Sequence, residues 1–133
     1  MYQEEEIISA TAMLLAVAKA DEILENDEID SIKNIIVDFF KLDSLDKSNK
    51  IIQLSKEKLT LSTDIFEFGR ILNKYWDYQD KVDFICCAFE LGYSDGTLHY
   101  LEEHIIKKIS TILNVNHKDL IDAKIEMKDY LID

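Results

Sequence analysis

Apolar residues recur at steps of three and four along most of the chain, and this spacing predicts α-helices. In the stretch from about Asp27 to Lys41, one stripe includes Ile32, Ile36 and Phe39 and is expected to face the core. The pattern leaves no room for a strand-dominated fold. We therefore expect an all-α protein.

The helix ends have to be read from capping residues, because the chain has no proline and only three glycines. We expect about seven helices, with the third starting at Asp43 or Ser44. The expected bounds are Glu4–Ala20, Asp27–Lys41, Asp43–Lys58, Asp64–Trp76, Gln79–Leu91, His99–Leu113 and His117–Ile132. For the first helix we expect a single buried face. Gly69 falls inside the fourth helix, where it is expected to allow a close helix contact.

Two parts of the chain resemble each other at a separation of 74 residues. Both copies read Asp-x-x-Leu-x-x-x-Glu-x-x-x-Ile, starting at Asp21 and at Asp95. In each copy a helix ends, an Asp lies in the turn, and a Glu, Glu28 or Glu102, opens the next helix. We interpret this as a compact bundle built from two pseudo-repeated helical hairpin halves, although chance similarity between two acidic turns is the alternative.

The chain has 133 residues, of which 47% are hydrophobic, and its formal net charge is −12. That length predicts one domain, residues 1–133. The negative charge makes nucleic acid and anionic membrane surfaces poor partners, whereas divalent cations and basic proteins become suitable ones.

The chain is expected to be cytoplasmic. Its only cysteines, Cys86 and Cys87, are adjacent and cannot join distant segments, which indicates a reducing compartment. The uncharged stretch 7–18 superficially resembles a signal peptide, but acidic residues precede it and Lys19 lies in the supposed cleavage site. No apolar run approaches the roughly 18 residues needed to span a bilayer, so no membrane insertion is expected.

Residues 18–28, AKADEILENDE, and residues 94–102, SDGTLHYLE, resemble the duplicated signature Ala-x-Ala-Asp-Gly-x-Ile/Leu-x-x-x-Glu of the TerB-like, tellurite-resistance-associated family. Glu22 stands where the family usually has Gly, and Ser94 replaces a small Ala. The same module occurs at the start of a membrane-anchored DnaJ-type co-chaperone. The resemblance implies a compact helical domain of duplicated origin with a role in metal or chemical stress. It also implies that acidic residues hold metal, and it transfers no catalytic activity.

The acidic corners are the candidate metal site, formed by Asp21, Glu28, Asp95 and Glu102. The second copy matches only the last half of an EF-hand loop. Because Ca²⁺ takes six to eight oxygen ligands, a site would have to draw on both copies or on neighbouring acids. Carboxylates suit Ca²⁺ or Mg²⁺ better than a thiolate-preferring ion. The alternative is that these four residues only build the corners, through turn hydrogen bonds and the helix macrodipole.

Other candidate chemistry is weaker. His99 and His104 are five residues apart and so face different sides of a helix, which argues against zinc. An aromatic cluster, which could be core or a partner-binding surface, comprises Tyr75, Trp76, Tyr78 and Phe84. No phosphate loop, nucleophile elbow or His-Glu-x-x-His motif is present, so an enzyme is not expected.

These patterns favour a small cytoplasmic binding or regulatory module that holds a divalent cation and is linked to stress response. The alternative is a protein-protein interaction domain that uses its acidic face or aromatic cluster without metal. A protein partner and homo-oligomer formation are both compatible with the sequence, and no cofactor other than a divalent cation is expected.

Overall fold

The computed structural model of the chain describes residues 2–20, 26–62 and 64–132. In those ranges it contains seven α-helices and no strand. Their bounds are α1 Glu4–Ala18, α2 Asn26–Phe40, α3 Leu45–Leu61, α4 Phe66–Tyr75, α5 Tyr78–Gly92, α6 Tyr100–Ile112 and α7 His117–Ile132. The predicted all-α class is confirmed, and the predicted helix ends differ from these by a few residues.

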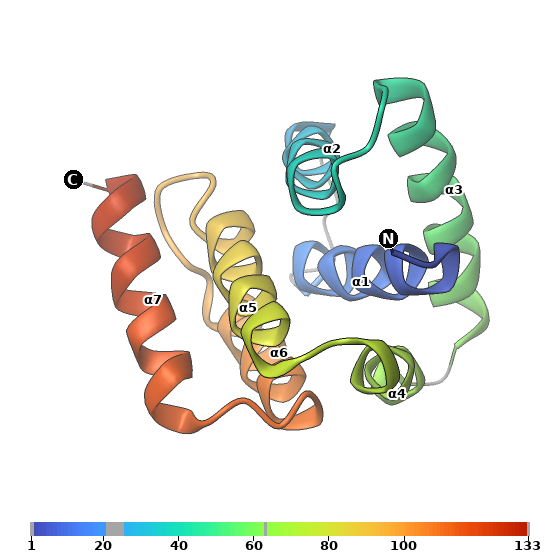
Figure 1. Cartoon of the computed structure of the whole chain (residues 1–133). Coiled ribbons are helices and arrows are strands. Elements are labelled where there is room, and N and C mark those ends of the chain that lie inside the picture. Colours follow the sequence, from blue (N-terminus) through green and yellow to red (C-terminus); the bar gives the residue numbers. More distant parts are fainter. Residues whose placement is uncertain (1, 21–25, 63, 133) are drawn as a thin grey trace.

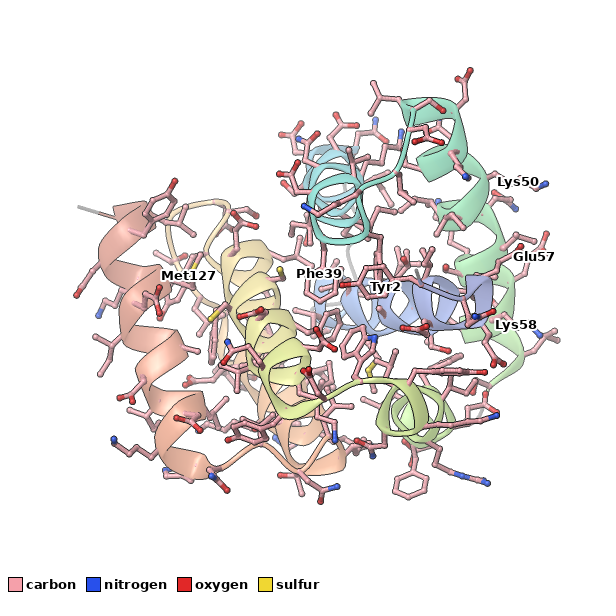
Figure 2. The ribbon with its side chains drawn as sticks, viewed as in Figure 1. Tyr2, Phe39, Lys50, Glu57, Lys58 and Met127 are labelled. Atoms are coloured by element: carbon pink, nitrogen blue, oxygen red, sulfur yellow. The ribbon has the colours of Figure 1, made fainter. Side chains whose placement is uncertain are left out.

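Helix α1 is the centre of the fold and contacts α2, α3, α4, α5 and α6. Figure 1 shows α1 running across the middle, with α2 above it, α4 below it and α3 at one end. Every residue from Ser9 to Leu15 is buried. The expectation that α1 buries one face is therefore wrong, because a helix that is apolar all round is enclosed on all sides. Helix α7 is outermost and packs on α5, where Met127 faces the core (Figures 1 and 2).

Local chemistry fixes the helix ends. Ser44 caps α3 by accepting a hydrogen bond from the backbone N–H of Lys47, and Asp77 caps α5 by accepting one from Asp80. After α2 and α6 the chain turns through left-handed residues, Lys41 at φ 54° and Asn114 at φ 61°.

The packing beside α1 includes a layer of aromatic rings from four segments. Figure 2 shows Tyr2 and Phe39 close together, and their ring centroids are 6.2 Å apart. The ring centroids of Phe39 and Trp76 are 5.4 Å apart. Those of Trp76 and Phe84, whose rings meet edge to face, are 5.2 Å apart. The layer joins the start of the chain to α2 and to the start of α5, and so stabilises the arrangement of both helical halves around α1.

Candidate functional site

The turn between α5 and α6 is closed by its own polar groups. Asp95 is exposed, and its Oδ1 accepts a hydrogen bond from the backbone N–H of Thr97 at 3.2 Å. The N–H of Gly96 donates to the carbonyl oxygen of Tyr93 at 2.9 Å. Gly96 has a φ of +100°, which favours glycine over residues with a Cβ. Asp95 and Gly96 therefore build this corner, whatever else Asp95 does.

Glu102 also has a structural role, at the start of α6. Its Oε1 accepts a hydrogen bond from the backbone N–H of His99 at 3.1 Å, while His99 Nδ1 accepts one from the N–H of Leu101 at 3.2 Å. This reciprocal capping satisfies backbone donors that a helix start leaves unpaired. The Glu102 side chain is only 6% exposed. A carboxylate that sequence reasoning proposed as a metal ligand is thus a buried helix cap.

The first corner is only partly described. Asp21 lies outside the described residues. Glu28 is half-buried in the first turn of α2. Helices α1 and α5 have the same length. Adding 74 to the residue numbers that bound α1 gives the bounds of α5, and adding 74 to the first residue of α2 gives the first residue of α6. Glu28 and Glu102 are consequently the third residues of corresponding helices. Whether a rotation relates the two halves stays a prediction.

Among residues 2–20, 26–62 and 64–132, no three His, Cys, Asp or Glu side chains are grouped so as to hold a metal ion. Glu103, four residues after His99 on α6, forms ion pairs with Lys107 and Lys124. The structure places Asp95 and Glu102 at the corner between α5 and α6, and it places Glu28 at the start of α2.

The two cysteine thiols are poorly suited to reaction. Both are free, and neither is fully exposed. Burial raises the pKa of Cys86 to about 11 and that of Cys87 to about 12, with nearby carboxylates adding to the shift. Because the thiolate is the reactive species, these thiols are protonated and unreactive at neutral pH.

The aromatic cluster divides into a core part and a surface part. Trp76 and Phe84 are 6% and 1% exposed, so they belong to the core. Tyr75 and Tyr78 are partly exposed at 38% and 40%. The core alternative therefore holds for Trp76 and Phe84, while a partner-binding role of Tyr75 and Tyr78 stays a prediction.

The two exposed tyrosines are held within the fold. The Tyr75 hydroxyl donates to the carboxylate of Glu5 on α1, and this hydrogen bond raises the Tyr75 pKa. The Tyr78 hydroxyl donates to Asp119 and accepts a hydrogen bond from the backbone N–H of Asn116 at 3.0 Å. The bond to Asp119 raises the Tyr78 pKa. Tyr75 thus joins the end of α4 to α1, and Tyr78 joins the start of α5 to α7.

Sequence reasoning missed a buried carboxylate on α1. Glu6 is 4% exposed, and its Oε2 accepts a hydrogen bond from the indole Nε1–H of Trp76 at 2.8 Å. Its Oε1 accepts another from the backbone N–H of Gln3 at 2.8 Å. A Gln-x-x-Glu capping pattern is readable in the sequence, but the Trp partner lies 70 residues away.

In the part of the chain that the structure describes, no helix combines the length and apolar character needed to cross a membrane.

The fold defines an all-α helical module in which carboxylates help to cap several helix starts, among them Glu6 in α1, Asp77 before α5 and Glu102 in α6. Comparison with known families then identifies which one: the family model described as "Tellurite resistance protein TerB" matches residues 7–125, and the chain belongs to this family. Searches of curated proteins and of solved structures give no match. The resemblance to a DnaJ-type co-chaperone stays a prediction.

Proposed function

We propose that this protein is a small, non-enzymatic binding or regulatory module that holds Ca²⁺ or Mg²⁺ at its acidic helix corners. The family's description as a tellurite resistance protein supports a role in the response to metal or chemical stress. A cytoplasmic location and a protein partner are part of the same proposal. Carboxylate ligands favour hard divalent cations over thiolate-preferring metals, and the high thiol pKa values above agree with this preference.

The observation that carries the proposal is the matched placement of Glu28 and Glu102. Each is the third residue of its helix, α2 or α6. In the sequence an Asp precedes each of them at the same spacing, Asp21 before Glu28 and Asp95 before Glu102. A cation shared by the corners would relieve carboxylate repulsion near two helix starts.

Thermal unfolding with added cation tests the proposal. At a concentration one hundred times the dissociation constant, a specifically bound Ca²⁺ or Mg²⁺ adds about 2.7 kcal/mol to the free energy of unfolding and raises the midpoint by several degrees. The reference sample contains NaCl at the same ionic strength, because screening alone stabilises an acidic protein.

Two variants remove charge while keeping the corner intact. In Asp95→Asn and Glu102→Gln the amide oxygen still accepts the backbone hydrogen bond, so the corner is retained without its negative charge. Asp122→Asn, on the exposed face of α7, is the matched control. Loss of the cation effect in the two corner variants, but not in the control, supports the site. An equal effect in all three, or none in the wild type, rules it out.

The second candidate function is a protein-interaction domain without metal. It is favoured by the hydrogen bonds that Asp95 and Glu102 already make inside the corner, since these account for both carboxylates without a ligand. In that case the free energy of unfolding is the same whichever divalent cation is added. Homo-oligomer formation belongs to this candidate and is measured by sedimentation at several concentrations.

A further inference from the structure

A groove of about 570 Å³ lies where α1, α3 and α4 meet. Its size is within the range of about 300–1,000 Å³ that is usual for ligand sites. Apolar side chains from all three helices line it, including Ile8 of α1, Leu54 of α3, and Phe68 and Ile71 of α4. Figure 2 labels Glu57 and Lys58 on the stretch of α3 that passes the start of α1.

The rim of this groove is acidic. Four exposed glutamates border it against a single lysine, Lys58, and they are Glu4, Glu5, Glu57 and Glu67. Among the ion pairs between described residues, none involves these glutamates. The rim therefore presents a net negative charge around an apolar floor, although Glu5 and Glu67 each accept a hydrogen bond from a hydroxyl, of Tyr75 and Ser62.

One side of the groove carries an unusually exposed apolar side chain. Leu61, the last residue of α3, lines the groove and is 83% exposed. A second hollow, on the outer side of α3, shares Glu57 and Leu61 with the groove. Leu61 thus stands between two hollows, where a bound segment could cover it.

We propose that this groove binds a basic, amphipathic segment of a partner protein. Leucine-like side chains of the segment would pack on the floor and against Leu61, and its lysines or arginines would lie along the glutamate rim. Charge argues for this occupant over a second copy of the chain, since two copies each carry a net charge of −12 and repel. The proposal is independent of the cation site, because none of the corner residues that the structure describes, Glu28, Asp95 and Glu102, lines the groove.

The test is the binding of fluorescently labelled peptides measured by anisotropy. The probe is a helical peptide of repeated Leu-Lys-Lys-Leu, and the two comparison peptides carry Glu in place of Lys or Ser in place of Leu. Saturable binding of the Leu/Lys peptide alone is expected. Absence of saturable binding, or equal binding of the Leu/Glu peptide, overturns the proposal.

Matched variants locate the bound peptide. Leu61→Ser is expected to weaken binding about tenfold, since a large apolar contact is lost, whereas Leu45→Ser, at a 60% exposed leucine at the start of α3, has no effect. Glu57→Lys is expected to weaken binding by up to about fivefold for each unit of charge. Asp122→Lys on α7 makes the same change in net charge at the other side of the molecule (Figure 1). Equal losses within either pair would show adsorption to the acidic surface and overturn the proposal.

Two further readouts separate this proposal from the cation-site proposal and from self-association of the chain. Asp95→Asn, and removal of divalent cations with EDTA, are expected to leave peptide binding unchanged, so the groove and the cation site can fail separately. Concentration-dependent self-association that Leu61→Ser abolishes would assign the groove to a second copy and overturn the peptide proposal.

Discussion

Gly69 is the position where the packing of α4 against α6 is most sensitive to a single methyl group. A Cβ placed there would lie 2.0 Å from Cγ2 of Ile112 and 3.4 Å from Cε of Met13. Carbon atoms in contact are normally about 3.5–4.0 Å apart. One turn later, Asn73 donates a hydrogen bond from Nδ2 to the carbonyl oxygen of Ile112 at 2.9 Å, which holds the two helices at this separation.

The expected effect of Gly69→Ala is a difference between two terms. Alanine in a helix interior is favoured over glycine by about 0.5–1 kcal/mol. Overpacking a tight contact costs about 1–3 kcal/mol, and here Ile112 must move by more than 1 Å or change rotamer. We therefore expect a net loss of about 1–2 kcal/mol in the free energy of unfolding, which lowers the thermal midpoint by several degrees.

Urea unfolding followed by the fluorescence of the single tryptophan, together with circular dichroism, measures this loss. Gly92→Ala is the matched control, because its Cβ would clash with the flexible end of Leu98, Cδ1 at 2.5 Å, and would meet Ile106 Cδ1 at an ordinary 3.6 Å, so a smaller loss is expected. In the double variant Gly69→Ala/Ile112→Ala the clash is absent, so the alanine at 69 should no longer destabilise. If Gly69→Ala stabilises the protein by its helix propensity, the close approach of α4 and α6 is refuted.

Three further predictions follow from buried polar groups. Trp76→Phe removes the indole donor to Glu6, which leaves a buried carboxylate oxygen unpaired and should lower the free energy of unfolding by about 1–3 kcal/mol in urea titrations; an unchanged value would contradict that hydrogen bond. Burial raises the pKa of Glu90 above its ordinary 4.5. The fold therefore disfavours the charged carboxylate, and this cost in the free energy of unfolding appears as the pH rises above 4.5. Glu90→Gln should accordingly raise the free energy of unfolding at pH 7 but not at pH 3. Cys86 and Cys87 should react with a thiol reagent at pH 8 far more slowly in the native protein than in urea, and equal rates would contradict their raised pKa values.

The helices were predictable because their signals are local. Capping residues such as Ser44 and the apolar stripe of α2 lie within a few residues of the ends and faces they determine. The surroundings of α1 were not predictable from its pattern, because an apolar helix can be covered on one side or on all sides, depending on the other helices. Gly69 was predicted to allow a close contact, but its partner Ile112 follows only from the packing of α4 on α6.

The candidate site shows the same division. Asp95 and Glu102 were identified as corner residues from sequence, and their hydrogen bonds to the turn and to the start of α6 match the corner-building alternative. The bond between Glu6 and Trp76 joins residues far apart in the chain, so no local pattern indicates it. The groove lined by Ile8, Leu54 and Phe68 is equally invisible in sequence, since it exists only where three helices meet.

The acidity of this protein is the feature that local structure explains least. Turn closure and helix capping account for particular carboxylates, Asp95 and Glu102, but neutral serine or asparagine can fill such roles, and they do not require a net charge of −12. Self-repulsion of that size destabilises a compact chain. A positively charged ligand offsets the repulsion wherever it binds, and the two proposals place it at different sites: a cation at the acidic corners that include Asp95, and a basic segment at the groove beside the start of α1. Variants at Asp95 and at Glu57 remove charge from one place without touching the other, so their separate effects decide where the negative charge is used.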